Sequence, residues 1–523
     1  MSAGGTVPVR AAGLRVERVL PVVLFALVLV VASMTVTPSP VGVFEDDAAY
    51  TVLGKALAEG DGYRFINLPG APHATHFPPG YPALLAVLWR VFPTFPDNIV
   101  VFKFANAILL TLAALGTYRF GRGRLGFAPL TAAGVALAGT ASVVVLKITG
   151  VVLSEPLFMA VMLPALLAAE RTADSGDLRS AVWAGVLLGV LALIRTIGAV
   201  AIPAALLLLL LRRRPAAAVA LAAGAALLLV PWQLWVSAYQ HEIPPVLVGK
   251  YGSYGPWLAE GYREGGLPFA AQVLATNAAR LRLALGFMLL PVEASWARGL
   301  AFFLLVGWLA AGLVSIVGRA PITAGFFVLY AAVIMVWPFQ PDRFVLAVWP
   351  LLTLVFFAAA LVLWRWRAPA GVLRIARSGA LAAGCCLLIG HATYNVKGYT
   401  RQWWASGQQH FDRSAKPIVD WVAHHTAIGD VLSTEEDLLI YLYTGRRAIP
   451  VSPSLALEHV RPLSPEENLQ WLEILLNEYR PRYYITEFRP AVRAADTLAN
   501  RRPPVLRRAG NTTNAYVYEF IRR

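Results

Sequence analysis

Long apolar segments recur along most of this chain, and they restrict its fold more than any other feature. Hydrophobic residues make up 58% of the sequence and charged residues only 14%, which is more apolar surface than a water-soluble protein of this size can bury in its core. A helix needs roughly 20 apolar residues to cross a bilayer. The sequence therefore predicts a polytopic, all-α membrane protein with about eleven transmembrane helices, near residues 19–36, 99–118, 126–146, 151–169, 180–194, 197–211, 216–237, 299–318, 322–338, 344–364 and 378–395.

The positive charges indicate how these helices are oriented. The net charge is +15, and lysine and arginine collect at the cytoplasmic ends of spanning helices. Arginines precede the first segment, at Arg10, Arg15 and Arg18, and lie in alternate connections between the predicted helices, with clusters at 119–124, 171–179, 212–214 and 365–377. This pattern predicts an integral cytoplasmic-membrane protein with a cytoplasmic N-terminus and an extracytoplasmic C-terminus. Because membrane topology accounts for the excess charge, no nucleic-acid partner is expected.

Two domains are predicted, at residues 1–396 and 397–523. The first is the transmembrane domain, and it includes two outer loops, at 37–98 and 239–297; the second loop is rich in Gly, Pro, Tyr and Trp and is interpreted as a lid. The second domain is soluble, and the alternation of strand and helix patterns predicts a small extracytoplasmic α/β domain. Its strands are expected at 430–434, 448–451 and 482–487, and its helices at 435–443 and 465–479.

An acidic triplet, Glu45-Asp46-Asp47, directly follows the first apolar segment. Carboxylates on the outer side of a membrane need a reason other than topology. Repulsion among adjacent carboxylates favours acceptance of a proton, which suits Asp46, with its neighbour Asp47, as the catalytic acid/base centre of a glycosyl transfer in which Asp46 is the general base. Two alternatives remain open: the carboxylates bind a divalent cation, or Asp47 caps a helix that begins at Ala48.

The sequence EDDAAYTVLGKALAEGDGY, followed by HFPPGYPALLAVLW, resembles the first outer loop of the GT-C glycosyltransferases. It is most similar to the bacterial branch of family 39 and its relatives, the protein O-mannosyltransferases and lipid A aminoarabinose transferases. The matching elements are the Asp46-Asp47 pair, a Gly-x-Gly-Tyr element at 60–63 and the Pro-rich segment 78–82, with further matches at 153–158, 193–196 and 342–350.

The resemblance implies a donor that carries its sugar on polyprenyl phosphate, which is attacked outside the cytoplasm with inversion at the anomeric carbon. It also implies that the first acidic residue of the pair, Asp46, is the base. The sequence departs from some relatives in having Phe77, preceded by His76, where they have a basic residue before Pro-Pro.

A departing phosphate requires cations, and four arginines lie near the outer ends of predicted helices: Arg195, Arg343, Arg280 and Arg282. Arginine suits this task because its planar guanidinium can grip two phosphate oxygens. For Arg195 and Arg343, contact with lipid headgroups is the alternative explanation, as is a pair with Asp342 for Arg343. His76 and Tyr81 are further candidates for substrate binding.

Glu155 lies near the outer end of the fourth predicted helix, on the same side as Asp46. A carboxylate in this position is costly unless it is paired or functional. Two interpretations stay open: an ion pair with Lys147, or a second acidic residue of the site that assists the acceptor or a metal.

The hypothesis these features favour is an inverting glycosyltransferase that moves a sugar from a polyprenyl-phosphate donor to an extracytoplasmic acceptor, which is a glycan, a lipid or a protein. The sequence identifies no cofactor, and a divalent cation held by Asp46, Asp47 and Glu155 remains open. The alternatives are a flippase or transporter without chemistry, and a receptor or scaffold. A transporter typically has inverted repeats, whereas this sequence has no evident repeat and concentrates its charged residues on one side.

Overall fold

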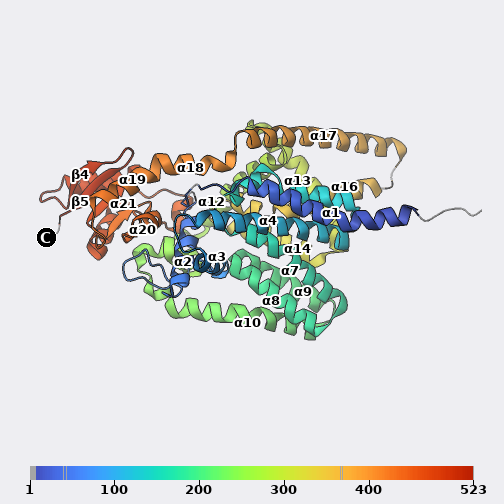
Figure 1. The fold of residues 1–523 in the computed structure, drawn as a ribbon, viewed down its shortest axis with the longest axis horizontal. Coiled ribbons are helices and arrows are strands. Elements are labelled where there is room, and N and C mark those ends of the chain that lie inside the picture. Colours follow the sequence, from blue (N-terminus) through green and yellow to red (C-terminus); the bar gives the residue numbers. More distant parts are fainter. Residues whose placement is uncertain (1–7, 39, 43, 366, 368, 522–523) are drawn as a thin grey trace, which may run out of the picture.

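The computed structural model describes residues 8–38, 40–42, 44–365, 367 and 369–521, and it contains a helical bundle with a smaller domain at one end (Figure 1). Helix α4 lies inside the bundle, where it packs against α1, α5 and α7, and α8 packs along α10. The bundle helices are α1 (Pro8–Ser33), α4 (Ile99–Phe120), α5 (Pro129–Thr140), α6 (Val143–Thr149), α7 (Glu155–Ser175), α8 (Leu178–Ile194), α9 (Ala201–Leu211), α10 (Pro215–Tyr239), α13 (Ser295–Val317), α14 (Pro321–Val336), α15 (Asp342–Ala347), α16 (Trp349–Arg365) and α17 (Ala370–Thr400).

Within the described residues, five helices are long and apolar enough to cross a membrane. A sixth span is added if α5 and α6, which meet at 55°, are taken as one broken segment, and several shorter apolar helices lie among the others. Each predicted apolar segment overlaps a helix, so an integral membrane protein with several spans is confirmed. Eleven full-length spans are more than the helix lengths support. The side chains of Arg10 and Arg15, on which the predicted orientation partly depends, lie outside those described.

The first outer loop forms two helices, as its apolar spacing predicts. Helix α2 (Asp46–Glu59) packs against α3 (Gly80–Val91) and against α20 (Asp437–Thr444) of the C-terminal domain. Most of α2 is buried. It therefore fixes the residues at its N-terminus relative to both domains.

The second outer loop, whose interpretation as a lid stays a prediction, forms helices that its composition did not indicate. It is mostly helical, with α11 (Val248–Tyr251) and the long α12 (Tyr254–Leu289), which is kinked at Gly266. Gly266 has a φ of 56°, a backbone angle that glycine adopts without a steric penalty. Glycine and proline within α12 obscured its helical pattern, because these residues ordinarily interrupt helices.

The C-terminal domain contains a five-stranded mixed sheet in the order β2-β1-β3-β5-β4. Strand β1 pairs in parallel with β2 and β3, which confirms the predicted α/β core, whereas β5 pairs antiparallel with β3 and β4. The hairpin of β4 and β5 was not predicted. The elements are α18 (Ser406–His410), α19 (Lys416–His425), β1 (Leu432–Thr434), α20, β2 (Ala448–Ile449), α21 (Pro465–Tyr479), β3 (Tyr483–Thr486), α22 (Arg489–Ala499), β4 (Leu506–Asn511) and β5 (Tyr516–Phe520).

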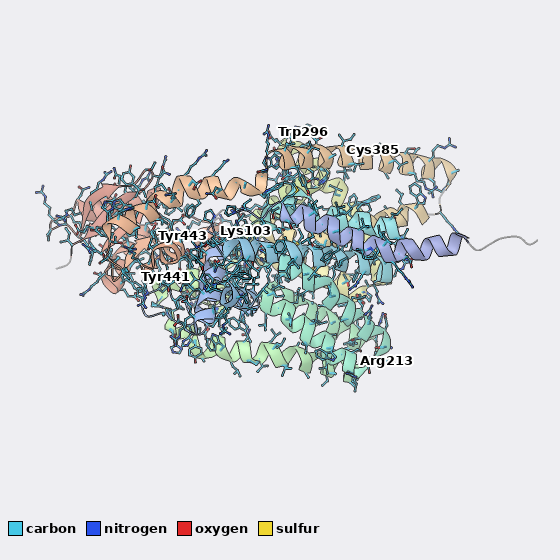
Figure 2. All side chains as sticks on the ribbon, viewed as in Figure 1. Lys103, Arg213, Trp296, Cys385, Tyr441 and Tyr443 are labelled. Atoms are coloured by element: carbon cyan, nitrogen blue, oxygen red, sulfur yellow. The ribbon has the colours of Figure 1, made fainter. Side chains whose placement is uncertain are left out.

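Both outer loops contact this domain directly. The Ala448 amide donates to the Asn67 carbonyl of the first loop at 3.0 Å, and Lys250 of the second loop pairs with Asp437 at 2.6 Å. In Figure 2, Tyr443 lies where the domain meets the bundle, and Arg213 lies at the far end of the bundle. The outer loops and the C-terminal domain thus gather at one end of the molecule, opposite one of the arginine clusters.

Candidate active site

A cavity of about 680 Å³ lies at the junction of the bundle, both outer loops and the C-terminal domain. One wall is polar and includes Asp46, Arg195 and Arg343. A second wall is apolar and comes from helix ends of the bundle, with Ile194, Ile197 and Val333. A third wall is aromatic, with Tyr254, Trp337 and Phe339. The C-terminal domain forms the fourth wall, with Leu438, Ser454 and His459. The cavity therefore combines charged groups with an apolar surface at the ends of apolar helices.

Asp46 begins α2 and lines this cavity, with about a third of its side chain exposed. Its neighbour Glu45 has a φ of 57°, a backbone angle that costs a non-glycine residue about 1–3 kcal/mol and is often found at functional sites. Lys250 pairs with the Glu45 carboxylate at 2.6 Å. The turn that aims Asp46 into the cavity is thus held in place by the second outer loop.

Asp47 lies in different surroundings from Asp46. Its side chain is fully buried, and its carboxylate accepts the backbone N–H groups of Gly42 at 2.8 Å and Phe44 at 3.2 Å. It is not among the residues that line the cavity. The structure places Asp47 as the residue that organises the turn before α2, close to the capping role that the sequence left open.

Glu155 is the buried centre of an ion-pair network. Its carboxylate is 0% exposed and contacts Arg195 Nη1 at 2.9 Å and Arg343 Nε at 3.0 Å. Arg343 also donates from Nη1 to the Asp46 carboxylate at 2.8 Å. Lys147 is exposed and does not pair with Glu155, so the two arginines take the place of the predicted Lys147 partner.

The arginines are held by rings and hydroxyls as well as by Glu155. The Arg343 guanidinium carbon lies 5.6 Å from the Phe44 ring centre, and that of Arg195 lies 5.7 Å from the Phe344 ring centre. Arg195 Nη1 also donates to the Ser154 hydroxyl at 3.1 Å. These contacts fix the direction of both guanidinium planes. Arg343 does not pair with its neighbour Asp342, contrary to one alternative drawn from the sequence.

Tyr50 connects the network to α2. It lies one helical turn after Asp46, and its hydroxyl is 3.2 Å from the Ser154 hydroxyl. Burial raises the pKa of Tyr50, and the nearby Asp46 carboxylate raises it further. Tyr50 therefore stays protonated and provides a neutral polar group in the cavity.

Two predicted substrate-binding residues pack beside this wall. His76 lines the cavity, and its Nδ1 lies 2.6 Å from the Gly252 carbonyl. Burial lowers the pKa of His76, so the imidazole is neutral at physiological pH and donates through Nδ1–H. Tyr81 is completely buried and donates to the Asn106 side chain at 3.1 Å. It lies behind Tyr50, which its ring contacts edge to face, and not on the cavity surface.

The two remaining arginines are not brought to the cavity wall. Arg280 and Arg282 lie on α12, and neither is a lining residue. Arg280 is near Asp342 and His459, whose ionisation it influences, and Arg282 lies against Gly299. The structure therefore separates these two arginines from the Arg195 and Arg343 pair.

The carboxylates that the sequence offered as a divalent-cation site, Asp46, Asp47 and Glu155, do not come together as metal ligands. In the described part of the chain, no three His, Cys, Asp or Glu side chains are placed to hold a metal ion. Arg343 lies between Asp46 and Glu155, and Asp47 points into its own turn. The position between the carboxylates is thus taken by a guanidinium.

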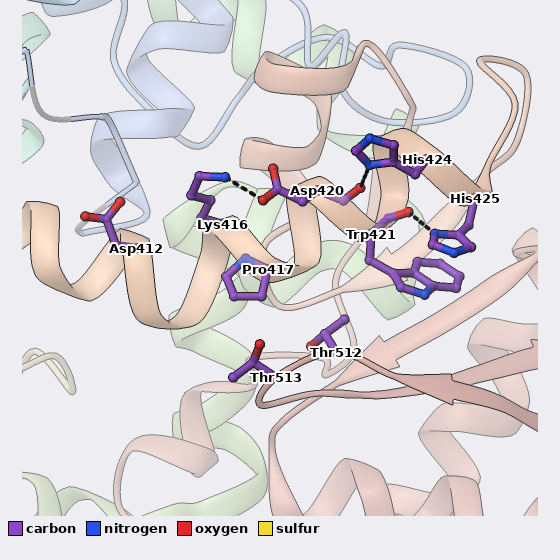
Figure 3. Close-up of a pocket in the computed structure, with 9 residues that line it drawn as sticks. All are labelled: Asp412, Lys416, Pro417, Asp420, Trp421, His424, His425, Thr512 and Thr513. Carbon is purple, nitrogen blue, oxygen red and sulfur yellow. Dashed lines mark hydrogen bonds and ion pairs between the residues drawn. The ribbon is translucent and has the colours of Figure 1, made fainter.

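A second hollow, of about 450 Å³, lies on the C-terminal domain beside α19 (Figure 3). Its two histidines are engaged by their own helix: His424 Nδ1 bonds the Asp420 carbonyl, and His425 Nδ1 bonds the Trp421 carbonyl. Lys416 pairs with the Asp420 side chain. These pairings engage the charged and imidazole groups of α19 there, as on an ordinary solvated helix face.

Several cavity residues were not predicted from the sequence. They are Tyr50, Lys250, Tyr251, Tyr254, Trp337, Phe339 and His459. Lys250 pairs with Asp437 at 2.6 Å, and Tyr251 donates to the same carboxylate. Lys250 was the one signal that the sequence offered for this group. It lies in an aromatic stretch of the second outer loop, and a lysine that is buried there needs an acidic partner.

Comparisons with known proteins show a likeness of fold. Protein-family models give no match to this chain, and no curated protein sequence matches it. Among solved structures, the crystal structure of ArnT from Cupriavidus metallidurans bound to undecaprenyl phosphate is similar, with a TM-score of 0.55, 13% identity and coverage of 95% of this chain and 97% of that one. The apo form of the same protein gives a TM-score of 0.54 at 14% identity, with the same coverage.

ArnT is a GT-C lipid A aminoarabinose transferase, one of the relatives that the sequence resemblance named. The special similarity to family 39 stays a prediction. Over almost its whole length, this chain has the fold of the GT-C membrane glycosyltransferase ArnT.

Proposed function

We propose that this protein is an inverting glycosyltransferase that uses a polyprenyl-phosphate sugar as donor and acts on an acceptor outside the cytoplasm. The observation that carries the proposal is the single cavity in which Asp46, two arginines and an apolar wall face one space. A lipid-linked donor needs these features together: a base for the acceptor, cations for the phosphate and an apolar surface for the lipid chain. The likeness to ArnT, whose structure holds undecaprenyl phosphate, adds support.

In the proposed reaction, an acceptor hydroxyl attacks the anomeric carbon from the face opposite the phosphate. Asp46 takes the hydroxyl proton, a new glycosidic bond forms, and the bond between the anomeric carbon and the phosphate oxygen breaks. The phosphate leaves as a monoester with one additional negative charge. Arg195 and Arg343 are the cavity cations that face this charge beside Asp46.

The proposal includes the predicted orientation and acceptor side. The C-terminal domain supplies one wall of the cavity through Leu438, Ser454 and His459. If this domain is extracytoplasmic, as the arginine pattern predicts, the acceptor reaches Asp46 from outside the cell membrane. The acceptor then has the chemistry of a glycan, a glycolipid or a hydroxyl-bearing protein.

The test is to incubate the purified full chain with a labelled polyprenyl-phosphate sugar and a cell-envelope acceptor fraction. Release of polyprenyl phosphate with transfer of the label supports the enzyme, and Asp46→Asn is expected to lower that rate by about 10²-fold or more, since it removes the base. Arg263→Gln, at an exposed arginine of α12, is the matched control. Movement of intact donor across a vesicle membrane without cleavage would instead identify a flippase, and full transfer by Asp46→Asn would remove the proposed base.

A further inference from the structure

Arg343 lies between the proposed base and the buried carboxylate of Glu155. It donates to Asp46 at 2.8 Å on one side and to Glu155 at 3.0 Å on the other. The Glu155 carboxylate is 0% exposed, whereas the Asp46 side chain is 32% exposed. One partner of Arg343 is therefore fixed inside the protein, and the other faces the space where a substrate would enter.

The charges around Arg343 are already balanced. Arg195 and Arg343 face Glu155 and Asp46, which makes two positive and two negative charges. Lys250, the other cation of the cavity among the described residues, pairs with Glu45 and Asp437. Each described cation that lines the cavity is thus committed to a carboxylate before any phosphate arrives.

During transfer, a negative charge moves from the base to the leaving group. When Asp46 accepts the acceptor proton, its carboxylate becomes neutral and no longer needs a cation. When the bond between the anomeric carbon and oxygen breaks, the phosphate gains one negative charge. The net charge of the site is unchanged, so the same guanidinium can serve the base first and the phosphate afterwards.

We propose that Arg343 exchanges its Asp46 partner for the departing phosphate as the sugar is transferred. This inference rests on the proposed function. Glu155 is the positioning residue of the exchange, because its contact with Arg343 is buried and takes no part in the proton transfer. Arg343 then contacts the reacting groups at both stages and stabilises the charge wherever it resides.

The exchange has a consequence for binding that a fixed ion pair would not have. The ionised Asp46 carboxylate competes with a phosphate monoester for Arg343. Removing the charge of Asp46 should therefore strengthen the binding of the product lipid, although it slows turnover. A purely structural role for the Asp46 and Arg343 pair predicts the opposite, because breaking it would loosen the wall that binds the lipid.

The experiment measures the affinity of the purified full chain for undecaprenyl phosphate, with no sugar and no acceptor present. Asp46→Asn is expected to bind the lipid roughly tenfold more tightly than the unmodified chain, the order of a charge-assisted hydrogen bond. Arg343→Gln should bind it more weakly, and Asp46→Asn combined with Arg343→Gln should show no gain over Arg343→Gln. Arg263→Gln should leave the affinity unchanged.

The outcomes separate this inference from the proposed function. The exchange is overturned if Asp46→Asn binds undecaprenyl phosphate no more tightly than the unmodified chain. It is also overturned if the double variant binds the lipid more tightly than Arg343→Gln alone. If Arg343→Gln does not fold, Arg343→Lys, which keeps the positive charge, replaces it. Adding Asp46→Asn to Arg343→Lys should then increase the affinity for undecaprenyl phosphate by less than adding it to the unmodified chain does. Lack of both binding and sugar transfer by the unmodified chain counts against the proposed function itself, whereas transfer without the Asp46→Asn gain rejects only the exchange.

Discussion

At the scale of single residues, the candidate site depends on one buried carboxylate. Glu155 contacts both Arg195 and Arg343 and is completely buried. Buried charges are tolerated when each has a partner, and removing one partner leaves the other uncompensated in a medium of low polarity. Glu155 therefore supports the polar wall as a whole.

Glu155→Gln is expected to reduce sugar transfer strongly and to destabilise the protein by about 3–5 kcal/mol, because the partly buried Arg195 and Arg343 then face a neutral amide. The measurements are transfer with labelled donor and thermal unfolding in detergent. Glu170→Gln is the matched control on the same helix, since Glu170 is also buried but binds Arg124 and Thr323. It should lower stability and keep transfer; equal loss of transfer in both variants would contradict a specific role for Glu155.

The sequence predicted the charged residues of the site better than their partners. Asp46, Glu155, Arg195 and Arg343 were found because a charge at the outer end of an apolar segment is conspicuous. Their pairing was not predictable, since Lys147 is nearer to Glu155 along the chain than either arginine is. Aromatic residues such as Tyr254 were missed because aromatics are common at membrane interfaces and carry no specific signal.

At the scale of helices, close contacts between small residues hold the bundle together. A Cβ atom added to Gly185 of α8 would lie 2.0 Å from the Leu221 carbonyl oxygen of α10, and one added to Gly224 would lie 2.2 Å from the Val182 oxygen. Membrane helices approach closely through such residues, since lipid provides no hydrophobic drive for association. The α8 and α10 pair therefore requires glycine at both positions.

Gly185→Ala is expected to separate α8 from α10 and to cost about 1–3 kcal/mol, the usual range for overpacking. Gly307→Ala on α13 is the control, because nothing lies within 4 Å of the added Cβ atom; it should be neutral or stabilising by up to about 1 kcal/mol. Thermal unfolding of the two variants in the same detergent gives the comparison. Similar melting temperatures would mean that the α8 and α10 contact is not a tight one.

Helix positions were predictable where the hydropathy signal was strong, and helix boundaries and breaks were not. The segment 126–146 reads as one apolar run, but the chain bends between α5 and α6. The helix α12 was missed because its Gly and Pro content resembles a loop. In both cases we infer that tertiary packing, and not the local preference of the sequence, determines where the helix begins and ends.

At the scale of the whole molecule, the cavity exists only because three distant parts of the chain meet. The first outer loop supplies Asp46, the second supplies Lys250, and the C-terminal domain supplies Leu438, while its Asp437 pairs with Lys250. Alternation of strands and helices predicted the domain, but not where it docks. Docking depends on single hydrogen bonds and ion pairs, such as Ala448 to Asn67, that have no pattern in the sequence.

The domain junction should respond to pH. Burial raises the pKa of Glu436 to about 8, with added repulsion from Glu435, Asp437 and Glu45 that Lys250 partly offsets. Since the folded protein then binds a proton that the unfolded chain releases near its ordinary value, stability is lost as pH rises from about 5 to about 8.

Glu436→Gln should therefore raise the melting temperature at pH 8 and change it little at pH 5, where Glu436 is protonated in the folded protein. Amide hydrogen exchange around 435–443 should fall at pH 8 in the same variant. The exposed Glu466 provides a control variant, Glu466→Gln, which should change stability equally at both pH values. A Glu436→Gln effect of the same size at both pH values would argue against a protonated Glu436 at the junction.

The central claim is that Asp46 and a lipid-linked phosphate share one cavity, and a structure of the Asp46→Asn variant with a polyprenyl-phosphate sugar bound tests it most directly. The account predicts phosphate oxygens about 2.7–2.9 Å from guanidinium nitrogens of Arg343, the anomeric carbon beside residue 46, and the lipid chain along the apolar wall of Ile194, Ile197 and Val333. A phosphate bound outside this cavity, or a side chain at position 46 turned away from the sugar, would contradict it.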